Sequence, residues 1–295
     1  GLHLGHVQGL SANNFDLIQA AVIGGTFLRV IQGGNMQENT LKQKLEQGKA
    51  VFGVMITFPS APMIEMLGYL GFDWVLIDNE HGSITVENSE DLVRAAEFTG
   101  IAPIIRPVSN KPEIIAQFLD RGAWGVQVPH VNTAEEAWAA VDAVKYYPEG
   151  HRGIFSRSRP AGYGFSGTTG DYVAEANRNT LVCLMLEEVE AIDNLKEMVK
   201  VDGVDVFFIG SGDLSQSMGF PGEQTHPEVQ AMMEKGVKVI RDAGKVAGVS
   251  CPDSYVPKFL DMGVQYFHGN VNSLLQSSSL SYLKEMREAA IASGL

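Results

Sequence analysis

Residues 74–106 read WVLIDNEHGSITVENSEDLVRAAEFTGIAPIIR and contain a complete strand–helix–strand unit. The two ends of this stretch, Trp74–Asp78 and Ala102–Arg106, are short apolar runs that predict strands. Between them, the apolar residues of Asn88–Thr99 recur with a period near 3.6, which predicts an amphipathic helix, and Gly100 follows where a helix commonly ends. Parallel strands need such a crossover helix, so this stretch indicates an α/β fold.

The same unit repeats along the chain. Short apolar runs predict eight strands, at Val51–Thr57, Trp74–Asp78, Ala102–Arg106, Gly125–Pro129, Leu181–Glu187, Val206–Gly210, Val246–Cys251 and Tyr266–Gly269. Helical patterns follow them at Ala61–Leu70, Asn88–Thr99, Pro112–Arg121, Ala134–Tyr146, Val189–Val199, Pro227–Ala243, Ser254–Met262 and Ser273–Ala292. Eight such units in about 260 residues are typical of a (β/α)8 TIM barrel. A doubly wound sheet is the alternative, but its usual Gly-rich phosphate turn is missing after the first strand.

Three segments depart from this rhythm. Residues 1–35 are Gly-rich without a clear period, so we expect an extension that is foreign to the natural chain or poorly ordered. Residues 36–295 should then form a single TIM-barrel domain. Tyr147–Thr180 is too long for an ordinary connection, and we expect a lid or an oligomer contact there. The long terminal helix expected over Ser273–Ala292 carries several leucines and needs a partner surface.

Composition excludes several classes of function. The chain has 295 residues, 45% of them hydrophobic, and a formal net charge of −13, which opposes binding to the phosphate backbone of nucleic acid. The two cysteines, Cys183 and Cys251, lie in apolar runs and favour neither a disulfide framework nor a thiolate zinc site. No apolar run approaches the roughly 18 residues of a membrane span, and no secretory signal is evident. We therefore expect a cytoplasmic protein without nucleic-acid or membrane partners.

Two carboxylates follow neighbouring predicted strands, where a barrel carries its reacting groups. Glu187 and Asp213 both come after fully apolar runs. Adjacent strands lie ~5 Å apart, so the two side chains would repel each other without a cation. An oxygen-only site with so few protein ligands suits Mg²⁺ or Mn²⁺. We expect a divalent metal cofactor, Mg²⁺, Mn²⁺ or Co²⁺, and no organic cofactor. The alternative for each acid is a surface carboxylate or a helix N-cap.

Arg106 and His81 complete the candidate site. Arg106 ends an apolar strand, so its guanidinium should project into the barrel mouth and stabilise an enolate or carboxylate oxygen. The alternative is a buried ion pair with Asp78 or Glu80. His81 lies just past the second strand among acids that would orient it, and an imidazole is the usual proton carrier near neutral pH.

Lysine is informative by its absence. No lysine ends a predicted strand, whereas a Schiff-base aldolase needs one. No Gly-rich phosphate loop follows the seventh or eighth strand, which disfavours phosphorylated substrates. Carbonyl chemistry in this barrel would therefore depend on a metal.

Together these strand ends resemble the HpcH/HpaI family of metal-dependent class II pyruvate aldolases. The resemblance runs from Val51 to about Leu275. It is carried by Gly71–His81, Arg106-Pro107 with Asn110 and Pro112, Val128-Pro129, Tyr147-Pro148 with Gly150, Arg152 and Gly153, Glu187, and Phe208–Gly210 with Asp213–Ser215.

The resemblance implies a role for each candidate residue. Glu187 and Asp213 would bind the metal, and the amides of Gly212 and Asp213 would hold the pyruvate carboxylate. Arg106 would stabilise the enolate and His81 would act as the base. The implied reaction is reversible retro-aldol cleavage of a 4-hydroxy-2-oxo acid to pyruvate and an aldehyde.

Further expectations come from the same resemblance. Asp120 would raise the basicity of His81, and because Asp120 ends a helix at the foot of its own barrel, it could do so only from a neighbouring subunit. The family exchanges its last helix between subunits and commonly forms hexamers built from dimers. Met185 stands where the family commonly has a substrate-contacting glutamine, and Asn79 where it has glycine. We expect the Met185 thioether to favour hydrophobic aldehydes.

Other functions stay open on the same residues. The site could decarboxylate oxaloacetate or cleave a thioester such as malyl-CoA or citramalyl-CoA, although the acidic surface disfavours the phosphates of coenzyme A. A barrel that acts only as a metal-binding scaffold subunit is the non-enzymatic alternative.

Overall fold

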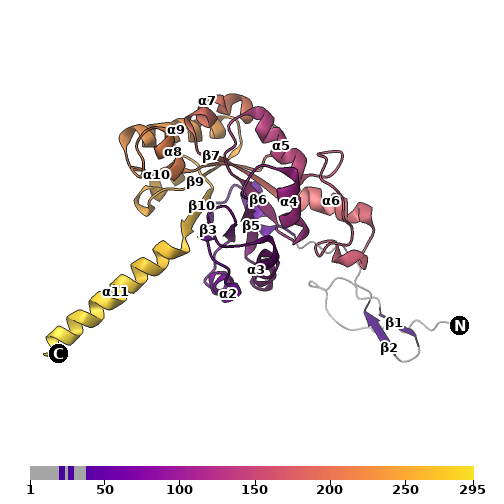
Figure 1. The fold of residues 1–295 in the computed structure, drawn as a ribbon, viewed down its shortest axis with the longest axis horizontal. Coiled ribbons are helices and arrows are strands. Elements are labelled where there is room, and N and C mark those ends of the chain that lie inside the picture. The colour runs from indigo at the N-terminus through magenta and orange to yellow at the C-terminus, as the bar shows by residue number, and fades with distance from the viewer. Residues whose placement is uncertain (1–19, 24–25, 30–37) are drawn as a thin grey trace.

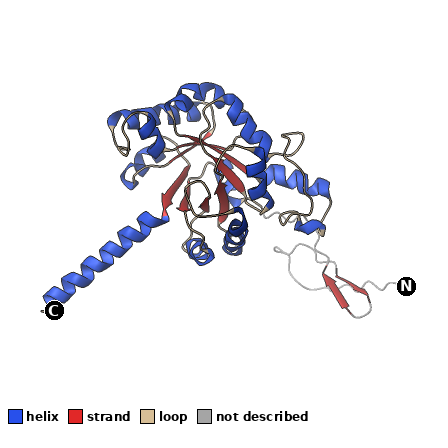
Figure 2. Ribbon diagram, viewed as in Figure 1, coloured by secondary structure: helices blue, strands red, loops and turns tan. Residues whose placement is uncertain are grey.

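The computed structural model describes residues 20–23, 26–29 and 38–295. The main body is a closed barrel of eight parallel strands, with β10 paired to β3. Figure 2 shows the strands at the centre and helices around them. The strands are β3 (Val51–Ile56), β4 (Trp74–Asp78), β5 (Ala102–Arg106), β6 (Gly125–Val128), β7 (Leu181–Leu186), β8 (Val206–Ile209), β9 (Val246–Val249) and β10 (Tyr266–Asn270). The predicted (β/α)8 barrel is confirmed.

The crossover helices follow the predicted ones within a few residues at each end. They are α2 (Ala61–Tyr69), α3 (Val86–Thr99), α4 (Pro112–Asp120), α5 (Ala134–Val144), α7 (Val189–Met198), α9 (Pro227–Asp242), α10 (Val256–Asp261) and α11 (Val271–Ala292). Capping explains several of their starts. In α3, for example, the Thr85 side chain accepts from the Asn88 amide while the Asn88 side chain accepts from the Thr85 amide.

The structure adds elements that the sequence patterns did not predict. Helix α6 (Thr169–Asn179) lies inside the long fourth-to-fifth connection, and α8 (Ser211–Ser217) follows β8 without a loop. Strands β1 (Ala20–Ile23) and β2 (Thr26–Arg29) form an antiparallel pair within the expected extension. The expectation of poor order in residues 1–35 otherwise concerns residues outside the described ones.

Strand alternation divides the apolar residues into two layers. Trp74 and Leu76 of β4 belong to the cluster inside the barrel, whereas Val75 and Ile77 belong to the layer between strands and helices. Leu41 and Leu45 of α1 (Thr40–Glu46) also join the interior cluster, so α1 closes the amino-terminal end of the barrel. The same alternation directs the next inward residue of each strand toward the open mouth.

Helix α11 does not cover the barrel. Figure 1 shows it projecting away from the strands, and Val271 is its one buried residue. It exposes Leu274, Leu275, Leu280, Tyr282, Leu283, Met286 and Ile291. Beside its base, a cavity of about 180 Å³ is lined by Phe52 of β3 and Phe267 of β10 among others, and Phe52 is 44% exposed. The outer face of β3 and β10 is therefore uncovered where α11 would pack in a self-contained barrel.

Among the helices of residues 38–295, none has both the length and the hydropathy that crossing a bilayer requires.

Candidate active site

The predicted site residues gather around one cavity at the mouth of the barrel. This mouth cavity has a volume of about 640 Å³ and lies at the carboxyl ends of the strands. The sequence-predicted residues that line it are His81, Arg106, Glu187, Gly212 and Asp213. Its apolar lining includes Met55, Met185 and Phe208. The structure thus brings together every predicted site residue except Asp120.

Arg106 is held by two carboxylates. Its Nε lies 2.8 Å from Asp78 Oδ1, its Nη2 lies 2.8 Å from Asp78 Oδ2, and Glu80 Oε2 is 3.2 Å from Nε. Burial lowers the pKa of Arg106, but the hydrogen bonds and charge of Asp78 outweigh it and raise the pKa overall. Among the described residues, Nη1 has one polar contact, with the Met185 sulfur at 4.0 Å. Nη1 is therefore available to a ligand in the mouth cavity.

Glu187 is a buried carboxylate whose nearest basic side chain is that of His130, with Nδ1 3.7 Å from Oε1. It is 1% exposed, and its Oε1 accepts a hydrogen bond from the amide of His130 at 3.0 Å. Burial raises the pKa of Glu187 to about 7; the amide and charge of His130 oppose this shift, and the negative charge of Asp213 adds to it. A Cβ on Gly210 would lie 3.1 Å from Glu187 Oε2, so the glycine leaves space beside this oxygen.

Asp213 lies in the first turn of α8, directly after β8. The first amides of a helix have no carbonyl partner inside it. In α8, the Ser211 amide donates to Ser250 Oγ, and Leu214 is the first residue whose amide reaches back, to the Gly210 carbonyl. The amides of Gly212 and Asp213 are therefore free of intrahelical bonds at the edge of the mouth cavity.

His81 stands at the rim of the mouth cavity. Its side chain is 64% exposed, and its Nε2 lies 3.7 Å from Glu80 Oε2. Asp78 Oδ1 accepts a hydrogen bond from the Glu80 amide at 3.1 Å and lies 3.5 Å from the His81 amide. Asp78 thus fixes both Arg106 and the turn that carries His81.

Asp120 is not near His81 within one chain. It is the last residue of α4, and its Oδ1 lies 2.7 Å from Arg152 Nη2. The helices of a barrel return the chain to the amino-terminal end of the strands, so Asp120 lies at the foot of its own barrel.

The sequence patterns assigned no role to His130, which follows β6. Its backbone is left-handed, with φ 52°. Its Nδ1 lies 3.2 Å from Glu188 Oε1, and its Nε2 lies 3.4 Å from Glu80 Oε1. Together with its amide bond to Glu187, these contacts join the ends of β4, β6 and β7. The one available signal was a polar residue directly after a buried strand.

The donor set for a metal is small. Among the described residues, no three His, Cys, Asp or Glu side chains are grouped so as to hold a metal ion by themselves. Glu187 and Asp213 alone would leave most coordination positions to water and substrate oxygens, which is the usual arrangement for Mg²⁺.

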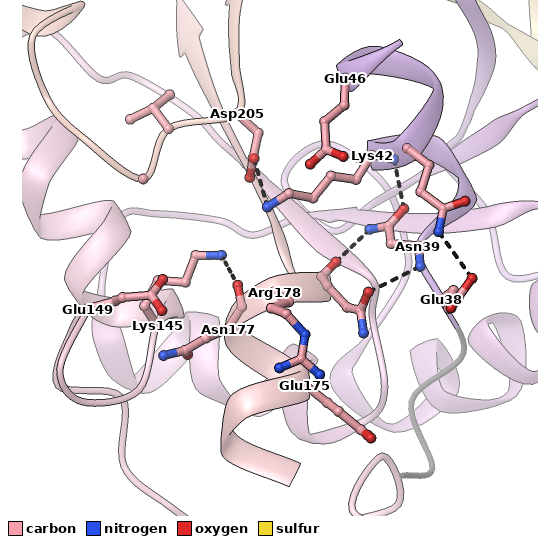
Figure 3. A pocket seen from close by; sticks show the side chains of 14 residues that line it. Glu38, Asn39, Lys42, Glu46, Lys145, Glu149, Glu175, Asn177, Arg178 and Asp205 are labelled. Atoms are coloured by element: carbon pink, nitrogen blue, oxygen red, sulfur yellow. Dashed lines mark hydrogen bonds and ion pairs between the residues drawn. The ribbon is translucent and has the colours of Figure 1, made fainter. Parts of the chain in front are cut away.

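A second cavity, of about 710 Å³, lies at the opposite end of the barrel. Figure 3 shows Lys42 of α1 pointing to Asp205, which precedes β8. The two side chains form an ion pair with Nζ 2.9 Å from Oδ1. Lys145 donates to the backbone carbonyls of Asn177 and Thr180 at 2.7 and 2.8 Å. These charged groups hold the base of the barrel together, and none of the predicted site residues lines this second cavity. The mouth cavity is the better candidate for chemistry.

Comparisons with known proteins bear on the family and the fold. The family model described as HpcH/HpaI aldolase/citrate lyase matches residues 52–266. Over 230 residues the chain is 38% identical to hydroxypyruvate/pyruvate aldolase from Roseobacter denitrificans, covering 77% of this chain and 89% of that protein. It is 35% identical over 244 residues to 2-keto-3-deoxy-L-rhamnonate aldolase from Escherichia coli, covering 82% of this chain and 90% of that protein.

A solved structure of a protein from this family has the same fold. An HpcH/HpaI aldolase/citrate lyase family protein from Burkholderia cenocepacia superposes with a TM-score of 0.79 at 26% identity. The superposition covers 84% of this chain and 99% of that one.

Proposed function

The chain belongs to the HpcH/HpaI aldolase/citrate lyase family of carbon–carbon lyases, and we propose from this premise that it cleaves 4-hydroxy-2-oxo acids to pyruvate and an aldehyde. The observation that carries the proposal is the mouth cavity. There, buried Glu187 and exposed Asp213 line the same cavity as the guanidinium of Arg106 and the imidazole of His81. An aldol cleavage needs a base for the 4-hydroxyl proton and a stabiliser for the enolate, and these residues supply both.

The two carboxylates fit a divalent cation. Glu187 is buried, its pKa is raised by that burial and by Asp213, and the missing side chain of Gly210 leaves space at Glu187 Oε2. A buried carboxylate beside a second one is stabilised by a positive charge. When bound, a cation such as Mg²⁺, Mn²⁺ or Co²⁺ would supply Lewis acidity toward the 2-oxo group.

Substrate binding follows from the donors at the rim. The free amides of Gly212 and Asp213 would donate to the carboxylate of the 2-oxo acid. Arg106 Nη1 would donate to the 2-oxo oxygen and stabilise negative charge there as the enolate forms. Because Asp78 binds the other edge of the guanidinium, Arg106 keeps its orientation throughout the reaction.

Proton transfer falls to His81. Its exposed ring at the rim would take the 4-hydroxyl proton, directly or through a water molecule, as the bond between the third and fourth carbons breaks. We further propose that Asp120 of a neighbouring subunit orients this ring. Asp120 is held in place by Arg152 and lies too far from the His81 of its own barrel.

This arrangement requires an assembly. The unpartnered apolar residues of α11 and the uncovered face of β3 and β10 are complementary in character, so we propose that α11 packs on a neighbouring barrel. The assembly would be a homo-oligomer, such as a trimer of dimers. Within each subunit, residues 36–295 would form the single catalytic domain, with 1–35 as an extension.

The test is a pyruvate-release screen on metal-stripped protein. Several 4-hydroxy-2-oxo acids, oxaloacetate and citramalyl-CoA are offered with and without Mg²⁺, Mn²⁺ or Co²⁺, with Glu187→Gln as the control variant. We expect metal-dependent pyruvate release from at least one hydroxy-oxo acid. Full turnover in EDTA, or release from oxaloacetate alone, would contradict the proposal.

A further inference from the structure

His268 lies in the floor of the mouth cavity, and neither the sequence patterns nor the proposed reaction uses it. It is on β10, two residues after Tyr266, and faces inward. Its ring stacks on Phe208 with centroids 5.0 Å apart and planes 12° apart, and meets the edge of Trp74 at 5.7 Å. Two fully buried aromatic rings therefore fix the orientation of this imidazole.

The imidazole of His268 stays neutral. Burial lowers the pKa of His268 to about 4, and the positive charge of Arg106 acts in the same direction. A group held neutral beside a guanidinium is not a candidate for carrying a proton in the reaction. Its function in the cavity must come from hydrogen bonding.

One ring nitrogen of His268 is already engaged. Nδ1 lies 3.3 Å from the carbonyl oxygen of Gly269. A carbonyl oxygen can only accept, so the hydrogen of the neutral ring lies on Nδ1. Nε2 then carries a lone pair and can only accept. Among the described residues no hydrogen-bond donor is paired with Nε2, although the residue lines the cavity.

We propose that His268 is a specificity-determining residue whose Nε2 accepts a hydrogen bond from a hydroxyl group of the substrate. A keto or carboxylate oxygen cannot donate to this lone pair, and an ammonium group is disfavoured beside Arg106. The enzyme should therefore prefer a 2-oxo acid (the aldol donor) or an aldehyde (the aldol acceptor) that carries an added hydroxyl group. This inference rests on the proposed aldolase function, since it assigns the substrate class of the same cavity.

The kinetic test compares substrates that differ by one hydroxyl group. Hydroxypyruvate is compared with pyruvate as donor, and glycolaldehyde with acetaldehyde as acceptor. In wild-type protein the hydroxylated member of at least one pair should have the higher kcat/KM. His268→Phe keeps the aromatic stack but has no acceptor, so it should reduce that ratio about tenfold. His268→Gln, which offers an amide oxygen, should restore part of it.

The chain offers a matched control in His226. Its ring also stacks on a phenylalanine, Phe220, with ring centroids 3.7 Å apart, but His226 does not line the mouth cavity. His226→Phe should leave the ratio within about twofold of wild type. If His268→Phe leaves both substrate ratios at their wild-type values, the proposal is wrong.

A measurement without turnover separates this proposal from the proposed function. If wild-type protein cleaves and condenses none of these substrates, the aldolase proposal fails, while nitrogen-15 NMR of the imidazole still decides the role of His268. The resonance assigned through His268→Phe should show a protonated Nδ1 and an unprotonated Nε2. Hydroxypyruvate should shift the Nε2 resonance more than pyruvate does. A protonated Nε2, or equal shifts with both ligands, would overturn the inference.

Discussion

Arg106 and Asp78 form a two-pronged ion pair at the barrel mouth, with Nε 2.8 Å from Oδ1 and Nη2 2.8 Å from Oδ2. The sequence left open whether Arg106 serves a substrate or a buried pair. The structure shows the pair, and it also shows that the pair occupies one edge of the guanidinium and leaves Nη1 to the cavity. The proposed substrate role would therefore use a different N–H group from the ion pair.

Removing the charge of Asp78 should affect both stability and activity. Asp78→Asn leaves buried Arg106 with only Glu80 as a carboxylate partner, and we expect the free energy of unfolding to fall by about 2–3 kcal/mol. The kcat/KM for cleavage should fall at least tenfold because Nη1 is no longer held toward the substrate. Urea denaturation and pyruvate release measure the two effects. Asp91→Asn, which breaks an exposed pair with Arg94, should cost less than ~1 kcal/mol; equal effects from the two variants would contradict this reading.

The pH dependence of stability should reveal Glu187 in metal-free protein. Its pKa is about 7 in the folded protein against an ordinary value of 4.5, so between these values the folded state binds a proton that the unfolded state has lost. The contribution of Glu187 to the free energy of unfolding is therefore greatest below about pH 4.5 and is lost as the pH rises through 7. The loss is on the order of 3 kcal/mol.

The comparison with Glu187→Gln isolates this effect. Urea denaturation in EDTA at acidic and at mildly alkaline pH should show wild type losing stability relative to the variant as the pH rises. Added Mg²⁺ should stabilise wild type at the higher pH and leave the variant nearly unchanged. A pH dependence that is the same in both proteins would show that Glu187 titrates normally.

His81 and Arg106 should separate kinetically. His81→Ala should slow aldol cleavage strongly but spare exchange of the pyruvate methyl protons, which water can assist. Arg106→Ala should impair both, because both reactions pass through the enolate. Proton NMR in deuterated water follows the exchange, and pyruvate release follows the cleavage. Small and equal effects from both changes would mean that the roles are misassigned.

Met185 should tune the preference for the aldehyde. It is the inward residue of β7 before Glu187, and its sulfur lies 4.0 Å from Arg106 Nη1. Met185→Gln would supply a donor and should shift the ratio of kcat/KM values toward acid-bearing substrates such as 4-hydroxy-2-oxoheptanedioate. We expect a change of ~1–3 kcal/mol in that ratio. An unchanged ratio for one polar and one apolar substrate would identify Met185 as barrel core only.

A shared active site can be tested by mixing inactive variants. Wild type should be oligomeric by light scattering, and His81→Ala and Asp120→Asn should each lower activity strongly. Hybrid oligomers of the two variants should regain about a quarter of wild-type activity, since random mixing pairs an intact His81 with an intact Asp120 at that frequency. A fully active monomer, or no recovery in the hybrids, would contradict the role of Asp120.

The buried strands could be predicted closely from the sequence. Trp74–Asp78 and Ala102–Arg106 have the predicted bounds because each is apolar on both faces and ends at the first charged residue. Helices α6 and α8 could not be predicted in this way. Thr169–Asn179 is mostly polar, and Ser211–Ser217 follows Gly210 directly, so neither shows an apolar face bounded by loop residues.

The site could be predicted only where it depends on strand ends. Arg106 ends β5, Glu187 follows β7, and His81 and Asp213 lie within four residues of the ends of β4 and β8, so the parallel barrel brings all of them to one cavity. The link from His130 to Glu187 spans 57 residues and depends on a left-handed backbone, which no local pattern specifies. Long-range contacts of this kind are set by the closure of the barrel.

The projecting helix α11 should make the stability of this protein depend on its concentration. If α11 of one chain completes the β3–β10 face of another, part of the folding free energy belongs to association and scales with the logarithm of concentration. The melting temperature should then rise with protein concentration, as it does for obligate assemblies. In dilute samples, the β3 face that exposes Phe52 would be the first part of the barrel to open.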